Sequence, residues 1–290
     1  MTLMRLARKK RSSYRHALYD PGTMQRWLRE HARRYVATHR RSAFIRRMAQ
    51  YCRSYLGWYD NRDYSPETNG EYRVLQALAA AKPRQLFDVG ANVGEWTRKA
   101  IAIHPQACVH AFEIVPATFA LLEAGAGGLA GVRLNPFGLS DVEASVHVHT
   151  VEGRTDLASI TGFTHSLAGP VVRGRTLTGD AYVREHHVES IDLLKIDVEG
   201  AEARVLRGFE RTFASGRIAA VQFEYGLSTV VGGALLADLY RFLEGHGFVV
   251  GKIYPDYVEF RPFRAADEDC SGPNYLAVRK ERADLIELLG

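Results

Sequence analysis

From residue 71 almost to the C-terminus, the sequence alternates between short apolar runs typical of strands and longer stretches with helical periodicity. This alternation predicts an α/β fold with a mostly parallel sheet and helices on both faces, because parallel strands are joined by crossover helices. Residues 142–176, which combine β-prone alternation with a Gly/Ser/Thr-rich stretch, are expected to form an inserted hairpin or lid. The runs that we predict as strands are residues 85–89, 108–113, 132–134, 191–196, 218–224, 248–253 and 275–278.

The first 60 residues are strongly basic, with 15 Lys and Arg against 3 Asp and Glu, whereas the remaining 230 residues carry 23 against 30. Apolar residues recur at spacings of three and four from Met24 to Tyr35 and from Phe44 to Leu56, which predicts two amphipathic helices. Their apolar stripes either pack on the α/β domain, or their basic faces bind an anionic partner. A turn-rich stretch follows, so we expect a basic helical N-terminal extension over residues 1–64 and the α/β domain over residues 65–290.

The composition is that of a globular protein, with 46% hydrophobic and 24% charged residues among 290. Cys52, Cys108 and Cys270 lie far apart and form no metal-binding motif, which favours a reducing compartment and excludes a disulfide scaffold. The N-terminus lacks the apolar stretch of a secretion signal, and no run of about 18 apolar residues occurs. We therefore expect a cytoplasmic protein without a transmembrane segment.

A glycine turn joins a predicted strand to a predicted helix within residues 86–97. The turn contains Gly90, Asn92 and Gly94, and Asp88 lies inside the end of the strand. Ligands of α/β sheets bind at the carboxyl ends of strands, and glycines there let a ligand approach the backbone closely. Because the turn lacks the third glycine of a dinucleotide fingerprint and the chain has no P-loop motif, the pattern disfavours NAD, FAD and nucleoside triphosphates.

Glu113 ends the next predicted strand, 19 residues after Gly94. A carboxylate at this position can accept hydrogen bonds from both hydroxyls of a ribose. The glycine turn and Glu113 together therefore indicate an adenosyl cofactor.

A third informative segment runs through residues 190–202. Its apolar strand carries Lys195 and Asp197 into Glu199 and Gly200, so that several charged groups gather at one strand end. Charged groups are costly to bury without partners, and an active-site cleft explains the arrangement. The alternative is a structural Lys–Asp pair.

Four segments, in this order, resemble the FkbM family of S-adenosylmethionine-dependent methyltransferases. The last of them is the family's most distinctive string, and the resemblance covers roughly residues 69–279. The basic N-terminal segment lies outside it. The four segments are Phe87-Asp-Val-Gly-Ala-Asn-Val-Gly-Glu95, Phe112-Glu-Ile-Val-Pro116, Gly138-Leu-Ser-Asp141 and Leu194-Lys-Ile-Asp-Val-Glu-Gly-Ala-Glu202.

The resemblance implies a Rossmann-like class I methyltransferase fold with a seven-stranded sheet, a reversed final hairpin and S-adenosylmethionine across the first strand tips. It implies that Glu113 holds the ribose and that the stretch from Asn69 to Glu71 closes over the cofactor. The residues that would surround the methionine part are Asp88, Gly90, Ala91, Asn92 and Gly94. The residues that would form a turn against the adenine are Phe137, Gly138, Leu139, Ser140 and Asp141.

Members of this family mostly methylate hydroxyl groups, so the resemblance implies transfer to oxygen on a small-molecule, sugar or glycan acceptor. Methyl transfer from a sulfonium is an in-line displacement, and an alcohol acceptor also needs a base. The candidates for the base are Asp197, Glu199, Glu224 and His165. Asp197 is the first choice as base or orienting group, and Lys195 would polarise the acceptor or pair with Asp197.

Asp197 and Glu224 offer oxygen ligands of the kind that magnesium prefers, but no run supplies a complete ligand set, so the sequence predicts no metal site. Two further functions stay open: an RNA methyltransferase whose basic helices hold phosphates, and a non-catalytic domain that binds cofactor or partner. No RNA-binding module lies outside the basic helices, so nucleic acid is not the expected partner. These helices are expected instead to dock on a biosynthetic partner or an anionic surface.

Overall fold

The computed structural model describes residues 21–161, 169–270 and 272–290. The chain divides into two compact units, Met1–Tyr59 and Asp60–Gly290. In the first unit, helices α2 (Pro21–Thr38) and α3 (Ala43–Tyr59) lie where the apolar periodicity predicts helices. No helix within the described ranges is long and apolar enough to cross a membrane.

The second unit is built on one large sheet whose strand order is β11-β10-β12-β9-β8-β1-β2-β3. Strands β3, β2, β1, β8 and β9 are parallel to one another, whereas β12, β10 and β11 are joined by antiparallel pairing. The strands are β1 (Gln85–Val89), β2 (Cys108–Phe112), β3 (Val132–Asn135), β8 (Leu193–Ile196), β9 (Ala220–Glu224), β10 (Phe248–Ile253), β11 (Val258–Phe260) and β12 (Asn274–Arg279). All seven predicted strands are present, and β12, inserted between β9 and β10, gives the expected reversed final hairpin.

The expected count of seven strands is wrong by one among the described residues, because β11 adds an eighth strand at the edge of the sheet. Strand β11 is only three residues long and pairs with β10 across a tight turn. A run this short has no period-2 pattern of its own, so only the pairing with β10 makes it a strand.

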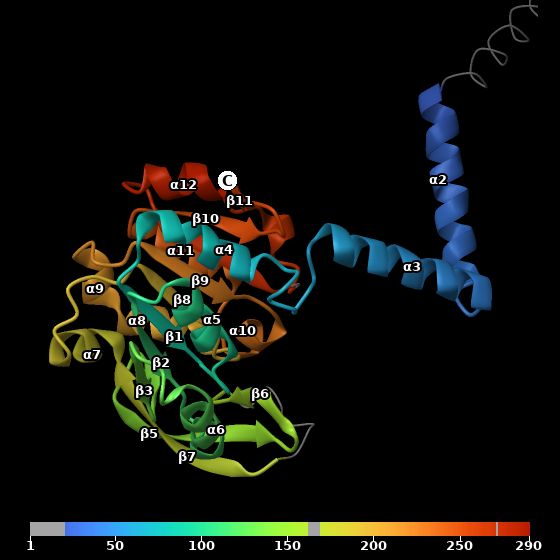
Figure 1. Cartoon of the computed structure of the whole chain (residues 1–290). Helices are drawn as coiled ribbons and strands as arrows, with labels where there is room; N and C mark the ends of the chain where they lie inside the picture. Colours follow the sequence, from blue (N-terminus) through green and yellow to red (C-terminus); the bar gives the residue numbers. More distant parts are fainter. Residues whose placement is uncertain (1–20, 162–168, 271) are drawn as a thin grey trace, which may run out of the picture. The chain divides into compact units, whose positions relative to one another are not determined.

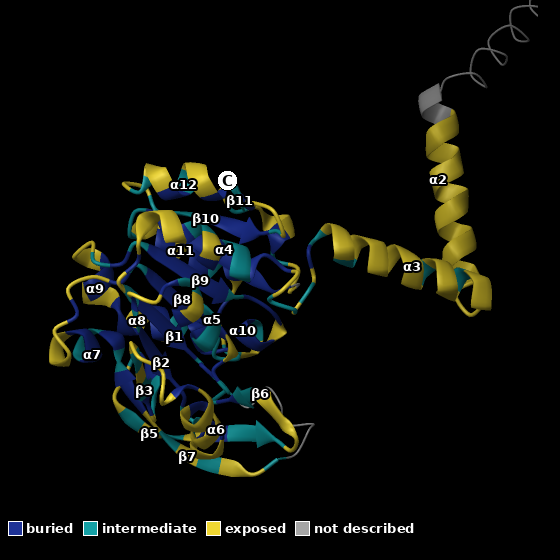
Figure 2. Ribbon diagram, viewed as in Figure 1, coloured by how far each residue is buried: buried dark blue, intermediate teal, exposed yellow. Residues whose placement is uncertain are grey.

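Helices cover both faces of the large sheet, as the alternation predicts (Figure 1). One apolar cluster joins one face of the sheet to α4, α5 and α12, and another joins the opposite face to α7, α8, α9 and α11. Figure 2 shows the central strands of the large sheet as the buried layer, with exposed residues on the outer sides of the helices. The helices are α4 (Glu71–Ala77), α5 (Glu95–Ile103), α6 (Pro116–Ala126), α7 (Gly179–Glu185), α8 (Glu202–Gly208), α9 (Glu210–Ala214), α10 (Leu227–Val231), α11 (Leu236–Gly245) and α12 (Ala283–Leu289).

The insertion between the third and fourth predicted strands forms a second sheet of order β4-β7-β5-β6, in which β4 is Gly138–Ser140. The expected hairpin is present as β5 (Ala144–Val151) and β6 (Arg154–Ser159), and β7 (Val171–Thr178) pairs with the other side of β5. His165, a predicted candidate base, lies outside the described residues.

Candidate active site

The carboxyl ends of β1, β2, β8 and β9 meet at one edge of the large sheet, because these neighbouring strands are parallel. The glycine turn follows β1, Glu113 follows β2, Asp197 follows β8, and Glu224 ends β9. The fold therefore gathers residues from four separate segments of the sequence at one edge, where ligands of α/β sheets bind.

The glycine turn lies directly against the end of β8. Gly90 has φ +87°, and a Cβ atom at this position would lie 1.8 Å from the carbonyl oxygen of Asp197. Only glycine fits this approach and this backbone conformation together. Gly94, with φ +82°, precedes α5, and a Cβ atom there would lie 2.6 Å from the side chain of Leu122, so its role is in the packing of α5 against α6.

Glu113 is buried and held in a fixed orientation by backbone donors. Its Oε2 accepts a hydrogen bond from the backbone N–H of Asn92 at 3.0 Å, and its Oε1 accepts one from the N–H of Val115 at 2.8 Å. Each oxygen keeps a second lone pair for a ligand hydroxyl. Burial raises the pKa of Glu113 to about 7, although the backbone hydrogen bonds oppose this shift.

Asp88 and Lys195 occupy paired positions on β1 and β8, and both point toward α5. The Lys195 ammonium lies 3.5 Å from Asp88 and 3.0 Å from Asp197, and the Thr97 hydroxyl donates to Asp88 at 2.6 Å. Burial lowers the pKa of Lys195, but the neighbouring carboxylates of Asp197, Asp88 and Glu71 outweigh burial and raise it. The predicted structural pairing of Lys195 with Asp197 is therefore present.

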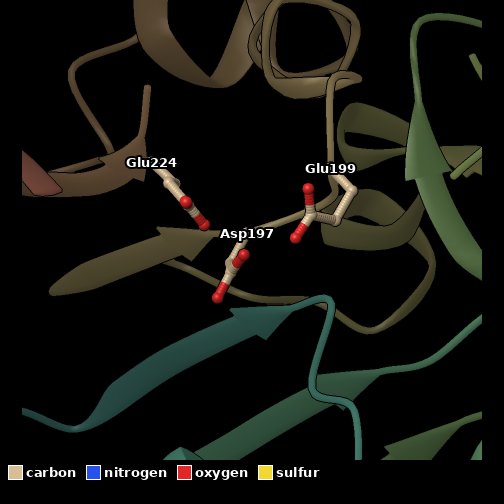
Figure 3. A group of neighbouring side chains, drawn as sticks. All are labelled: Asp197, Glu199 and Glu224. Atoms are coloured by element: carbon tan, nitrogen blue, oxygen red, sulfur yellow. The ribbon is translucent and has the colours of Figure 1, made fainter. Parts of the chain in front are cut away.

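Asp197, Glu199 and Glu224 form a cluster of three carboxyl groups at the tips of β8 and β9. Each offers one oxygen, and these oxygens lie within 4.8 Å of one another. Figure 3 shows the carboxyl groups of Glu199 and Glu224 directed toward Asp197 from two sides. Such a cluster can accept several hydroxyl hydrogen bonds, and its oxygens are also of the type that binds a divalent cation.

The three carboxyl groups of this cluster differ in proton affinity. Burial acts to raise the pKa of Asp197, but the Lys195 ammonium outweighs it and holds this pKa below its ordinary value. Burial and the negative charge of Asp197 raise the pKa of Glu199 to about 8. Burial, Asp197 and Glu199 also raise the pKa of Glu224 well above its ordinary value. Asp197 is thus the member of the cluster that is ionised at neutral pH, and Glu199 titrates close to neutral pH.

A pocket of about 610 Å³ connects Glu113 with the carboxyl cluster. Gly90, Asn92 and Glu113 line it together with the three carboxyl groups of the cluster. Residues Arg154 to Ala158 of β6 form a further wall, so the inserted sheet contributes to the pocket. One cavity therefore has room for both a nucleoside and a second ligand.

A smaller adjoining pocket of about 220 Å³ lies on the α5 side of the glycine turn. It is lined by Ala91, Trp96 and Lys195, among others, and it shares Gly90, Asn92 and Asp197 with the larger pocket. The Nε1–H of Trp96 is buried and has no partner among the described residues. An unpaired buried donor beside an ammonium marks a place where a ligand carboxylate would be stabilised.

Glu71 lines the smaller pocket, but its carboxylate is engaged by amide groups. Its Oε1 accepts from Asn69 at 2.9 Å and from Asn274 at 2.8 Å, and its Oε2 accepts from Gln222 at 2.8 Å. These bonds fix the start of α4 to β9 and β12. Gly70, just before α4, lies close to the chain after β10, since a Cβ atom there would lie 2.3 Å from the backbone oxygen of Tyr254.

The segment from Phe137 to Asp141 differs from the expected turn, because Gly138–Ser140 forms strand β4, which pairs with β7. Gly138 and Leu139 line the larger pocket. Phe137 packs against Phe112, Ser140 is buried, and Asp141 forms an ion pair with Arg207 at 3.2 Å. The pairing partner of β4 lies more than 30 residues away in the sequence, so no local pattern reveals this strand.

Three residues that line the pocket, Tyr64, Arg154 and Asp156, could not be predicted from the sequence. Tyr64, in the segment before α4, lines both cavities. Arg154 and Asp156 face the larger pocket from β6 and pair with each other through two contacts of 2.8 and 2.6 Å. An isolated tyrosine in a turn and an alternating strand carry no motif, and only the tertiary fold brings them to the site.

The strand order, with a central glycine turn, an acid after the second strand and an antiparallel final hairpin, defines a Rossmann-like class I methyltransferase. The family model described as the methyltransferase FkbM domain matches residues 88–250. The chain belongs to this family and is an S-adenosylmethionine-dependent methyltransferase.

Two curated relatives match half of the chain or more. The chain is 34% identical over 197 residues to the 31-O-demethyl-FK506 methyltransferase FkbM of Streptomyces tacrolimicus, covering 57% of this chain and 72% of the relative. It is 29% identical over 161 residues to the 2-O-methyltransferase NoeI of Sinorhizobium fredii, covering 50% and 65%. A solved FkbM methyltransferase from Methylobacillus flagellatus superposes with a TM-score of 0.42 at 14% identity, covering 68% of this chain and 44% of that one.

The residues of the site fit S-adenosylmethionine. Glu113 offers acceptors for ribose hydroxyls, and the glycine turn provides the close backbone approach that the cofactor requires. The unpaired Nε1–H of Trp96 and the ammonium of Lys195 suit the carboxylate of the methionine part. The two adjoining cavities therefore match the two ends of the cofactor.

Proposed function

We propose that this protein transfers the methyl group of S-adenosylmethionine to a hydroxyl oxygen of a neutral sugar, glycan or polyhydroxylated natural product. The observation that carries the proposal is the lining of the larger pocket, which contains four carboxyl groups in addition to that of Glu113. Arg154 is the single cation among the described residues that line it, and Asp156 already pairs with Arg154. The acidic residues are Glu113, Asp156, Asp197, Glu199 and Glu224.

Carboxyl groups bind hydroxyl-rich acceptors by accepting their hydrogen bonds, but they repel an anionic acceptor. A uronic acid or a phosphodiester would place its negative charge beside the ionised Asp197 without an unpaired cation among the described lining residues. The acceptor site therefore favours a neutral hydroxyl compound over RNA. The names of two of the curated relatives, which specify O-methyl positions, also support transfer to oxygen.

When bound, the cofactor supplies an activated methyl group on a sulfonium. Glu113 and the glycine turn would hold the adenosyl part, while Trp96 and Lys195 would hold the methionine carboxylate. Asp197 lies at both cavities and would orient the acceptor hydroxyl by accepting its hydrogen bond. Positioning of the two reactants in one closed space lowers the entropic part of the barrier.

The hydroxyl proton leaves as the new bond between oxygen and carbon forms. Asp197 is a weak base because Lys195 stabilises its ionised form. We assign the role of general base to Glu199, whose pKa of about 8 lies near neutral pH and which lines the same pocket. This assignment changes the first choice made from the sequence, where Asp197 was the preferred base or orienting group.

The proposal is tested with a matched pair of acceptors, a neutral hexoside and the same glycoside with a carboxylate in place of its hydroxymethyl group. We expect kcat/KM to be about 100-fold or more higher for the neutral compound, because like charges in a pocket cost several kcal/mol. The Asp156→Asn variant leaves Arg154 without its ion-pair partner, so the ratio of kcat/KM for the neutral compound to kcat/KM for the charged one should fall. A preference for the uronate, or methyl transfer to an RNA oligonucleotide alone, would contradict the proposal.

A further inference from the structure

The two helices of the N-terminal unit are amphipathic along their whole described length. At 100° per residue, the apolar side chains of α3 fall within one arc of about 160°. They include Phe44, Met48, Tyr51, Tyr55 and Trp58, of which Phe44 is 69% and Trp58 is 72% exposed. The apolar side chains of α2, led by Trp27, Leu28 and Tyr35, likewise share one face and are exposed. Figure 2 shows both helices as almost entirely exposed.

The opposite faces of these helices are made of arginine. Residues 21–59 contain nine arginines, no lysine and a single acid, Glu30. In α3, Arg46 and Arg53 lie opposite the aromatic arc, and in α2, Arg29 and Arg33 do the same. Guanidinium groups bind phosphates through paired hydrogen bonds, so nine arginines with a single acid favour a phosphate-rich surface.

We infer that α2 and α3 bind an anionic phospholipid bilayer and lie in its interface. A bilayer surface offers phosphates and an apolar layer side by side, which matches a helix that carries arginine on one face and large apolar side chains on the other. Tryptophan and tyrosine rings prefer this depth because their bodies are apolar and their tips are polar. RNA would satisfy the arginines but would leave the apolar arc in water.

The helices suit a surface position better than a spanning one. They have 18 and 17 residues, and neither is apolar enough to cross a membrane. The unit would place the enzyme on the membrane without inserting a segment through it. This inference does not depend on the identity of the acceptor.

The experiment uses the full chain and sedimentation with phosphatidylcholine vesicles, prepared with and without phosphatidylglycerol. We expect binding to the anionic vesicles only, weakening as salt rises above about 0.1 M because surface charges are then screened. Tryptophan fluorescence should shift to shorter wavelength on binding, and the Trp58→Phe variant, which keeps Trp27, should show a smaller shift.

Two variants test the arginine face and the apolar face of α3 separately. Replacement of Arg46, Arg47 and Arg53 by Gln should weaken vesicle binding by about 100-fold, since each arginine contributes about fivefold near an anionic surface. The double variant Phe44→Ser/Trp58→Ser should weaken it by at least about tenfold through lost apolar burial. Replacement of three exposed cations of the second unit, Arg184, Arg204 and Lys280, by Gln is the matched control and should leave binding unchanged.

Calorimetric titration with S-adenosylmethionine shows whether the second unit of each variant is folded. We expect every variant to keep the wild-type affinity. Wild-type protein that stays in solution with anionic vesicles at low salt would overturn the inference, as would equal binding to neutral vesicles. If the protein did not bind vesicles but self-associated, and Phe44→Ser/Trp58→Ser abolished the self-association, the apolar face would instead bind a second copy of the chain. Retention of RNA without vesicle binding would assign the arginines to nucleic acid.

Discussion

The ammonium of Lys195 lies 3.0 Å from the carboxylate of Asp197, and this pair joins the cofactor end of the site to the acceptor end. Lys195 lines the smaller cavity, whereas Asp197 lines both. The same ammonium lies 3.5 Å from the fully buried Asp88. One buried cation therefore keeps two carboxyl groups in place and sets which member of the carboxyl cluster is ionised.

Removal of this cation should destabilise the fold. Lys195→Met leaves Asp88 and Asp197 without their partner, so we expect the free energy of unfolding at pH 7 to fall by about 3–5 kcal/mol. Without the ammonium, burial favours the protonated carboxyl groups in the fold, so the deficit should grow as pH rises and shrink in acid. Urea unfolding at several pH values measures it, and the exposed Lys280→Met is the control. A deficit that does not vary with pH would contradict the pairing.

The affinity for S-adenosylmethionine should depend on the ionisation of Glu113. Because burial raises the pKa of Glu113 to about 7 and ribose hydroxyls bind best to the carboxylate, affinity should increase as pH rises through 7 and then level off. Glu113→Gln should lower the affinity by about tenfold at pH 8 and remove this pH dependence. Calorimetric titration tests both statements, with exposed Glu123→Gln as the matched control. Unchanged affinity in the Glu113 variant would refute the ribose assignment.

Asp197→Asn should separate catalysis from cofactor binding. The amide keeps the shape of the side chain but loses the ionised acceptor that orients the hydroxyl, so we expect kcat to fall by about 100-fold or more. Cofactor affinity should stay within a few-fold of the wild type, because Glu113 and the glycine turn remain. Steady-state kinetics and calorimetry on the same preparation measure the two effects. Equal loss of both would show that Asp197 acts in cofactor binding.

The pH profile of turnover should identify Glu199 as the base. Turnover should rise with pH through about 8, since the base must lose its proton to act. Because the charge of Asp197 helps to raise the pKa of Glu199, Asp197→Asn should move the rising limb to lower pH. Glu199→Gln should abolish the limb and most of the rate. A limb that persists in Glu199→Gln would assign it to another group.

Turnover should be insensitive to metal chelation. Lys195 already pairs with Asp197, and the raised pKa values of Glu199 and Glu224 leave Asp197 as the ionised member of the cluster at neutral pH, so a divalent cation would meet a single, already paired carboxylate. Methyl transfer should therefore proceed at the same rate before and after dialysis against EDTA. Loss of activity that magnesium restores would instead make the cluster a metal site.

The sequence was informative where the chemistry depends on local motifs. The glycine turn, Glu113 and the segment around Asp197 each follow a strongly apolar strand, so both the strand and the position of the residue at its tip could be predicted. The expected seven strands are all present, because each is a buried run with a clear boundary.

Features that depend on contacts between distant residues could not be predicted. The carboxylate of Glu71 is bound by Gln222 and Asn274, which are 151 and 203 residues away. Strands β4 and β11 have three residues each and exist only through pairing with β7 and β10. The proton affinities in the carboxyl cluster follow from burial and mutual distance, which no spacing in the sequence encodes.

The most direct test of the proposed methyl transfer to oxygen is to identify the atom that receives the methyl group. The enzyme would be incubated with S-adenosylmethionine carrying a trideuterated methyl group and a neutral glycoside, and the product analysed by mass spectrometry and NMR. We expect a single trideuteromethyl ether on a hydroxyl oxygen from the wild type, and much less of this product from Asp197→Asn. A methyl ester, an N-methyl or C-methyl product, or unchanged transfer in that variant would contradict it.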